Sequence, residues 1–325
     1  MKAALVLTAG SPSLRQQAGE INIVAKSLAT VLSSIEVWLF YQDNQPEFFP
    51  EFDCSLSGVT LIATEHDHLP ESYLQSLQQL MNLCPVDLLL FGSDGLGAEL
   101  ATRLSYRLNS SSCLQVEDCN VTSEKIEVVK PVYGNNLMAR FVLEFPPYCI
   151  SVAKQPCRPA KMIRCELPIK EKFTLNPPRY NWIKESLTIQ DQQNTGLTDA
   201  DMVLVVGQGV KNQETVDALQ TMAREIGAEL GASRPVVMNG WTDMNRLIGA
   251  SGLILSPKLC LAAGVSGTAV FSVGIKSSEF IVAINTDVKA PIFHIADVGI
   301  VGDLQAVLYE LKKVIIKEQS NNVSS

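Results

Sequence analysis

The sequence predicts an α/β fold with two domains, each a mainly parallel sheet flanked by helices. Three observations lead to this prediction. The chain has 325 residues, more than one hydrophobic core usually contains. Short apolar runs alternate with helical patterns in both halves, an order typical of parallel sheets. A proline-rich, polar segment separates the halves.

The domain boundaries follow from these patterns. We expect an N-terminal domain at 1–165, a linker at 166–198, a second domain at 199–318 and a frayed tail at 319–325. The linker lies where the chain turns irregular, from Lys154 to about Thr198, with prolines at 156, 159, 168, 177 and 178.

In the N-terminal domain, apolar runs predict strands buried on both faces, and helical spacing predicts helices. The opening apolar run is interpreted as a buried strand and not as a signal peptide. An Asn-rich turn between two alternating runs predicts an added β-hairpin. The expected strands are Ala3–Thr8, Glu36–Phe40, Val86–Phe91, Lys125–Val132, Leu137–Phe145 and Tyr148–Val152, and the expected helices are Gln16–Leu32, Glu71–Leu83 and Gly95–Leu108.

The last third of the chain restarts the alternation of strands and helices. The expected strands are Asp201–Val206, Leu259–Ala263 and Phe280–Ile284, and the expected helices are Gln213–Ile226 and Leu304–Ile316.

Composition excludes several classes of function. The formal net charge is −8 with no basic run, which argues against nucleic acid as a partner. No stretch is apolar for long enough to span a bilayer, so membrane insertion is not expected. The eight cysteines show no Cys-x-x-Cys pair or zinc spacing, which indicates reduced thiols and a cytoplasmic location.

No residues are expected to bind a metal or to act in acid–base or nucleophilic catalysis. The run Thr64-Glu65-His66-Asp67-His68 is interpreted as a solvated loop, although it contains possible metal ligands. His294 lies in an apolar run and is interpreted as structural.

Four glycine-bearing segments of the C-terminal domain mark a candidate ligand site. They are Gly207-Gln208-Gly209, Gly231-Ala232-Ser233-Arg234-Pro235, Ile248-Gly249-Ala250-Ser251-Gly252 and Gly264-Val265-Ser266-Gly267. Each is placed where a strand meets the next element, the edge at which open α/β sheets bind ligands. The last segment leads from a strand into a helical stretch, so it fits either a pyrophosphate site or a tight turn without a ligand.

The stretch from Gly196 to Ile316 resembles the FAD domain of the electron transfer flavoprotein alpha subunit. The resemblance rests on Gly196–Asp201, Gly231–Val237, Val282–Asn285, Ala290–Phe293 and Ala296–Asp303. It implies a flavodoxin/Rossmann-like domain that binds FAD. The N-terminal half is similar more loosely, through Val86–Gly92 and Pro131–Asn135.

The resemblance also implies roles for single residues. It places Arg234 over the flavin ring, the Gly264–Gly267 turn on the pyrophosphate, and Asn285 and Asp303 on the adenosine half. The whole cofactor site implied in this way consists of Gln208, Ser233, Arg234, Ile248, Gly249, Ala250, Ser251, Gly264, Val265, Ser266, Gly267, Thr268, Phe271, Asn285, Asp303 and Leu304.

The chain departs from the family pattern on the flavin side. Gln208 replaces an arginine, Ala250 a glutamine, Ser251 a threonine, and Val270-Phe271 a glutamine–histidine pair. In the family, the histidine of this pair lies near the flavin atoms that become negative on reduction. Phe271 takes its place here and cannot stabilise that negative charge. We therefore expect FAD to bind, with a less stabilised one-electron reduced form.

The expected function is that of an alpha subunit in a heterodimeric electron carrier. The resemblance implies a beta-type subunit as partner, with the N-terminal domain as its interface. Flavoprotein dehydrogenases, such as the acyl-CoA dehydrogenases of fatty acid β-oxidation, are implied as donors, and a quinone-linked or other oxidoreductase as acceptor. Two alternatives remain: an interaction subunit that binds FAD or AMP without ordinary flavin redox function, and an enzyme with its own substrate.

Overall fold

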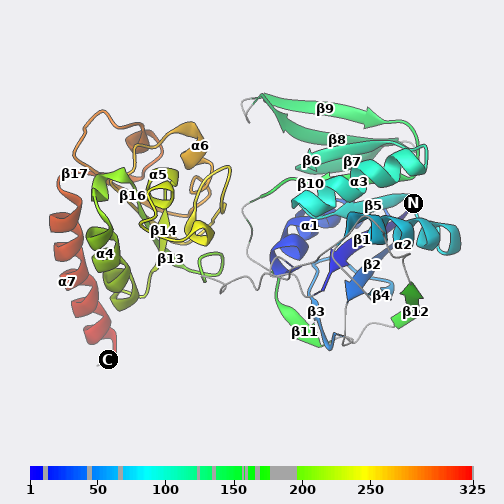
Figure 1. The fold of residues 1–325 in the computed structure, drawn as a ribbon, viewed down its shortest axis with the longest axis horizontal. Helices are drawn as coiled ribbons and strands as arrows, with labels where there is room; N and C mark the ends of the chain where they lie inside the picture. The colour runs from blue at the N-terminus through cyan, green and yellow to red at the C-terminus, as the bar shows by residue number, and fades with distance from the viewer. Residues whose placement is uncertain are drawn as a thin grey trace, which may run out of the picture. The chain divides into compact units, whose positions relative to one another are not determined.

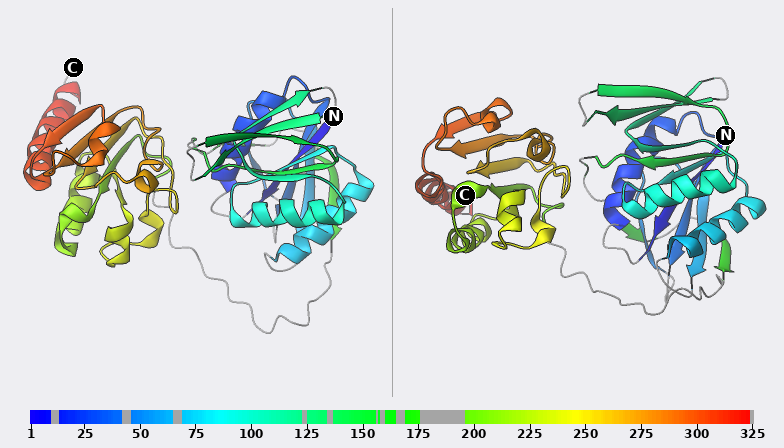
Figure 2. Two further views of the ribbon diagram at one scale, coloured as in Figure 1. Left: turned by 90° about the horizontal axis from the view of Figure 1, so that it is seen from above. Right: turned by 45° about the horizontal axis from the view of Figure 1, so that its top comes forward.

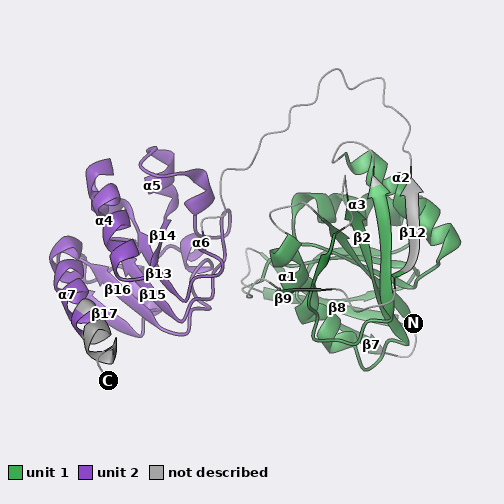
Figure 3. Cartoon of the chain, turned by 90° about the horizontal axis from the view of Figure 1, so that it is seen from below, with its two compact units in different colours: residues 1–191 green, residues 192–325 purple. Residues whose placement is uncertain are grey.

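The structure of the chain is a computed structural model that divides into two compact units, Met1–Asp191 and Gln192–Ser325 (Figure 3). The α/β class predicted for both halves is confirmed in each unit (Figure 1). Within the part of the chain that the structure describes, no helix is long and apolar enough to cross a membrane. The described residues are 1–9, 14–41, 46–64, 69–122, 125–133, 137–155, 157, 160–164, 169–175 and 196–323.

Unit 1 is built on a seven-stranded parallel sheet with the strand order β12-β4-β2-β1-β5-β10-β6. Its strands are β1 (Lys2–Thr8), β2 (Ser34–Tyr41), β4 (Gly58–Thr64), β5 (Leu88–Phe91), β6 (Ser112–Val116), β10 (Tyr148–Val152) and β12 (Ile169–Leu175). Its helices are α1 (Leu14–Leu28), α2 (Pro70–Leu83) and α3 (Gly95–Arg107).

The alternation of side chains along β1 explains why helices cover both faces of this sheet. Leu5 and Leu7 belong to a core shared with α1, and Ala4 and Val6 belong to a second core shared with α2 and α3. Because successive side chains of a strand point to opposite faces, an uninterrupted apolar run serves both cores.

The predicted hairpin strands are present, and a third strand joins them. β7 (Asp118–Thr122), β8 (Lys125–Val132) and β9 (Leu137–Leu143) form an antiparallel sheet in which β9 is an edge (Figure 2). Residues 134–136 of the expected turn lie outside the described residues. The inner face of this sheet packs on the α1 side of unit 1 through Ile126 and Val128.

The expectation that the segment 154–198 is irregular throughout is wrong. The segment 154–198 contains β11 (Met162–Arg164), which pairs with β3 (Phe48–Pro50), and the sheet strand β12. The strand at 169–175, whose backbone pairs with β4, was not predicted, because the prolines on either side of this short alternating run indicated a linker. The predicted linker otherwise falls mainly at 176–195, outside the described residues, as do residues 65–68.

Unit 2 contains a five-stranded parallel sheet with the strand order β14-β13-β15-β16-β17. Its strands are β13 (Met202–Val206), β14 (Glu229–Ala232), β15 (Leu259–Ala263), β16 (Ile281–Asn285) and β17 (Val298–Val301). Its helices are α4 (Gln213–Glu225), α5 (Arg234–Met238), α6 (Ala269–Ser272) and α7 (Leu304–Val323), with short 3₁₀ turns at Gln208–Val210, Met244–Arg246 and Pro291–His294.

The two faces of the unit 2 sheet are covered differently. One face packs against α4, α5 and α7, whereas the other is covered mainly by non-helical segments around Ile248, Val265 and Ile292. Helix α7 extends to Val323, past the expected helix end at Ile316, because Lys317-Glu318-Gln319 are good helix formers. The frayed tail expected at 319–325 stays a prediction.

Candidate functional site

The order of strands in unit 2 creates a crevice at the carboxyl edge of its sheet. From β13 the chain crosses to β14 on one side and then returns to β15 on the other. At such a reversal the flanking connections leave on opposite faces, and ligands bind between them. A pocket of about 700 Å³ opens here, a size that is typical of ligand sites.

The strand register explains why the predicted segments meet at this pocket. Val206 pairs with both Ala232 and Ala263, and Ala263 pairs with Ile284. The residues that follow these strand positions therefore stand next to one another at the edge of the sheet. They are Gly207, Ser233, Gly264 and Asn285.

The loops after β13 and β15 touch through their glycines. The Gly209 amide donates to the Gly264 carbonyl at 3.0 Å. A Cβ at Gly207 would lie 2.2 Å from the same carbonyl oxygen, which is too close for any side chain. The Gly207–Gly209 turn is therefore explained by this packing, whatever the pocket binds.

The loop from Gly264 to Thr268 exposes a row of backbone amides. Gly264 and Gly267 have φ angles of +66° and +80°, which are accessible to glycine at little cost. Among the described residues, no acceptor is bonded to the amide N–H groups of Val265, Ser266, Gly267 and Thr268. Consecutive amides without acceptors form a concave site for an anion, so the loop fits the diphosphate of a dinucleotide.

Packing fixes the position of this loop. The Ile292 amide donates to the Ser266 carbonyl at 3.1 Å, and a Cβ at Gly267 would lie 2.2 Å from the Ile292 nitrogen. On the other side, Leu304 contacts Gly264. Glycine is thus required at 267 by backbone conformation and by contact with Ile292, and Leu304 supports the loop from behind.

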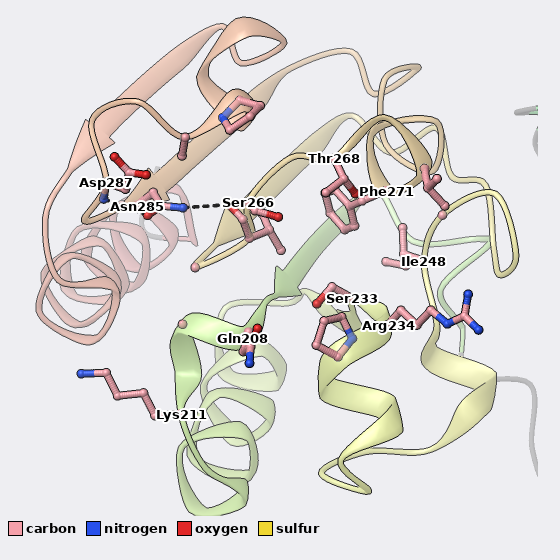
Figure 4. A pocket seen from close by; sticks show the side chains of 18 of the residues that line it. Gln208, Lys211, Ser233, Arg234, Ile248, Ser266, Thr268, Phe271, Asn285 and Asp287 are labelled. Atoms are coloured by element: carbon pink, nitrogen blue, oxygen red, sulfur yellow. Dashed lines mark hydrogen bonds between the residues drawn. The ribbon is translucent and has the colours of Figure 1, made fainter. Parts of the chain in front are cut away.

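One end of the pocket carries a cation, Arg234. Ser233 is 7% exposed, and its amide donates to the Val206 carbonyl at 2.9 Å. Arg234 is exposed, and its guanidinium has no protein partner among the described residues. Figure 4 shows the Arg234 side chain at the end of the pocket farthest from Asp287. An arginine left unpaired here is available to a ligand.

The wall near Arg234 is apolar. Phe271 is 7% exposed and belongs to the same core as Ile248. Val270 is largely exposed, and its carbonyl accepts from the Ala250 amide at 2.9 Å. This bond ties the loop after Ile248 to α6, so the two segments form one wall.

The opposite end of the pocket is organised around Asn285. Its Nδ2 donates to the Val265 carbonyl at 2.8 Å, a bond drawn in Figure 4. Its Oδ1 accepts from the Asp287 amide at 2.9 Å. Asp303 instead caps α7, because its Oδ1 accepts from the amides of Gln305 and Ala306 at 3.0 and 3.1 Å.

The pocket brings together most of the predicted site. The predicted residues that line it are Gln208, Ser233, Arg234, Ile248, Gly249, Ser251, Gly264, Val265, Ser266, Thr268, Phe271 and Asn285. The predicted residues Ala250, Gly267, Asp303 and Leu304 are not among its lining residues. The pocket is also lined by residues that were not predicted, namely Gly209, Lys211, Pro235, Val270, Asp287, Ala290 and Pro291. For Asp287, its distance of twenty residues from Gly267 was a readable signal.

Comparisons with known proteins identify the family. Residues 196–276 match the electron transfer flavoprotein FAD-binding domain, and residues 57–174 match the electron transfer flavoprotein domain. The putative electron transfer flavoprotein subunit YgcQ of Escherichia coli is 33% identical over 90% of this chain and 97% of its own length. This chain belongs to the electron transfer flavoprotein alpha-subunit family.

Other family members support this assignment. The electron transfer flavoprotein subunit alpha of Bacillus subtilis is 27% identical over 77% of this chain and 79% of its own length. LctC, a subunit of a lactate dehydrogenase (NAD(+),ferredoxin) of Acetobacterium woodii, is 32% identical over 77% of this chain. The match spans 61% of LctC. The resemblance stated from sequence is confirmed, and the family's FAD-binding domain confirms FAD as the cofactor.

Proposed function

We propose that this electron transfer flavoprotein alpha-type chain pairs with a beta-type subunit, and that the pair carries electrons from a flavoprotein dehydrogenase to a downstream oxidoreductase. The observation that carries the proposal is the unit 2 pocket, where the amides at 265–268 and the Arg234 guanidinium at one end have no partner among the described residues. When bound, FAD supplies the electron-transfer chemistry, and the protein sets its position and potential.

The chain's own residues divide into three tasks. The amides of 265–268 and the hydroxyl of Ser266 hold the diphosphate, Arg234 places a positive charge on the ring, and Phe271 with Ile248 keeps water from one side of it. Two cations line the pocket among the described residues, and they lie at opposite ends of it: Arg234 at the proposed flavin end and Lys211 at the other (Figure 4). Arg234 offsets the negative charge that the ring gains on reduction.

The exposed β9 strand supports a partner subunit that docks on unit 1. Leu137, Met138, Phe141 and Val142 are between 45% and 58% exposed, and β9 is a sheet edge. A long apolar edge is a liability in a free monomer. We propose that the beta-type subunit covers it.

The apolar wall favours a second candidate function, in which the bound nucleotide is structural. Val270 and Phe271 stand where the family has polar side chains, and Gln208 replaces an arginine. In that case the chain is a nucleotide-binding interaction subunit without ordinary flavin redox function.

Co-expression with a beta-type subunit tests both candidates. The purified complex is expected to be yellow, to contain FAD, and to bleach reversibly when reduced. A complex that holds FAD but resists reduction supports the structural role. A folded complex that is colourless and takes up no added FAD contradicts the proposal.

A further inference from the structure

We propose that the Asp287 carboxylate binds the 2′-hydroxyl of the adenosine ribose, so that the pocket selects a ribonucleotide at this end. The proposal rests on FAD occupying the unit 2 pocket. Among the described residues that line this pocket, Asp287 is the one that carries a carboxylate.

The position of Asp287 in the chain carries the first step. It follows β16, the strand after the amide-bearing loop, and lies twenty residues beyond Gly267. In parallel sheets that bind dinucleotides, an acidic residue about 20 residues past the glycine turn accepts from the ribose 2′-hydroxyl. The same geometry arises here because β15 and β16 are parallel neighbours.

A short relay of hydrogen bonds ties Asp287 to the diphosphate loop. The Val265 carbonyl accepts from Asn285 Nδ2 at 2.8 Å, and Asn285 Oδ1 accepts from the Asp287 amide at 2.9 Å. These bonds fix the distance between the diphosphate loop and Asp287. The ribose and the diphosphate of the ligand are joined covalently, so the site must hold their two binding groups at a matching distance.

The carboxylate itself is held with one oxygen available. Asp287 Oδ1 accepts from the Lys289 amide at 2.9 Å, and Oδ2 has no protein partner among the described residues. A side chain that is already oriented loses little entropy when it binds a hydroxyl. Asp303 is less suited to this task, because it caps α7 and does not line the pocket.

The direction of the ligand follows from the two ends of the pocket. Arg234 lies at one end, and Asn285 and Asp287 lie together at the other (Figure 4). If the flavin ring rests on Arg234 and the diphosphate on the central loop, the adenosine reaches Asp287. Lys211, also at this end, is exposed and lies across from Asp287 without a protein partner among the described residues.

The test compares FAD with its 2′-deoxyadenosine analogue. Both are titrated into the complex with the beta-type subunit after removal of FAD, and dissociation constants are read from flavin fluorescence. The unaltered chain is expected to bind FAD about tenfold more tightly than the analogue, which corresponds to about 1.4 kcal/mol. Asp287→Ala is expected to weaken FAD binding by a similar factor and to bind the two ligands equally.

Two further variants make the result specific. Asp287→Asn retains an acceptor without the charge and should keep part of the preference. Asp217→Asn, an exposed acid on α4 outside the pocket, should keep all of it. Equal binding by the unaltered chain, or an unchanged preference in Asp287→Ala, overturns the ribose contact while FAD binding stands. Failure of the unaltered complex to bind FAD overturns the proposed function as well.

Discussion

Gly267 is the residue whose replacement should separate packing from backbone strain. Its φ of +80° resembles that of Gly227, at +75°. A Cβ at 267 would lie 2.2 Å from the Ile292 nitrogen, whereas a Cβ at 227 meets nothing within 4 Å. Both alanine variants should lose about 1–2 kcal/mol of unfolding free energy to the left-handed backbone, and Gly267→Ala should lose more, because its Cβ would clash with the Ile292 backbone.

Gly267→Ala should in addition lose FAD affinity by at least about tenfold, because the amide row must move away from Ile292. Gly227→Ala should bind FAD normally. Urea unfolding and FAD titration check the two effects. Equal FAD affinity in both variants would show that the 265–268 loop does not hold the diphosphate.

Arg234 is the residue expected to set the potential of the bound FAD. Its side chain lies at the end of the pocket, which is also lined by the apolar Phe271, and a nearby positive charge favours a ring that becomes negative. Arg234→Gln should lower the one-electron potential by roughly 60 mV, a tenfold change in the equilibrium.

A spectroscopic redox titration measures this shift. Arg224→Gln removes the same charge from the exposed end of α4 and should leave the potential unchanged. Because Phe271 supplies no charge, the one-electron reduced form should accumulate little even in the unaltered complex. Strong accumulation would contradict the expectation drawn from the Val270-Phe271 pair.

Glu20 predicts a pH dependence of stability that is unrelated to the cofactor. Its side chain is 1% exposed, and Oε2 has no hydrogen-bond partner among the described residues. Burial raises the pKa of Glu20 above 4.5, against hydrogen bonds from Ser93 and Gln16 and the charge of Lys154. The folded state therefore binds the proton more tightly than the unfolded state, and stability falls as pH rises from 4.5 through the folded pKa.

Glu20→Gln should remove this loss. The variant should gain stability relative to the unaltered chain as pH rises above 4.5, with the gain levelling off beyond the folded pKa. Urea unfolding at several pH values measures it, with the exposed Glu51→Gln as control. A gain that is constant across pH would mean that ionisation of Glu20 is not its cause.

At the scale of elements, the long helices were predictable, whereas several strands were not. Helices α2, α3 and α4 were placed to within a residue or two, since apolar residues at helical spacing mark them clearly. α1 ends at Leu28, earlier than expected, because Thr30 and Val31, which follow, are β-branched. β14 was missed because it has four residues including Gly231, and β17 because it contains Gly299; pairing with neighbours, which the local sequence does not show, makes them strands.

Strand β9 leads to a prediction about assembly. Phe141→Glu places a charge on the exposed apolar edge and should prevent association with the beta-type subunit, because the carboxylate cannot be buried without a partner. The chain should remain folded, since Phe141 is already 45% exposed. Size-exclusion chromatography with the partner measures the loss.

Val314→Glu provides the matched control for this edge, because Val314 is an exposed residue of α7 in unit 2. It should leave the complex intact. Association of Phe141→Glu at unchanged affinity would move the partner interface away from β9.

At the scale of the whole molecule, the place of the site was predictable but part of its membership was not. The carboxyl edge follows from the order of strands and helices, and the glycine turns mark it. The assignment of FAD came from the resemblance, since the turns alone also fit an empty connection. Lys211 depends on how β13 ends beside β15, which is a tertiary effect. Asp287 was signalled in the sequence by its distance of twenty residues from Gly267. The cap that Asp303 forms on α7 is local, because its partners are the amides of Gln305 and Ala306.

The separate cores of the two units predict how far the cofactor's stabilisation extends. Among the described residues, the buried clusters of unit 1 contain no residue of unit 2, and the reverse also holds. FAD at 100 times its dissociation constant stabilises the unit that binds it by about 2.7 kcal/mol.

In the complex with the beta-type subunit, adding FAD should therefore slow amide exchange along β13, β15 and β16, by up to about a hundredfold. Exchange in β1 and β5 should stay the same, since their hydrogen bonds open with unit 1. Hydrogen-exchange mass spectrometry measures both sets together, and equal protection of all five strands would show that the units unfold as one.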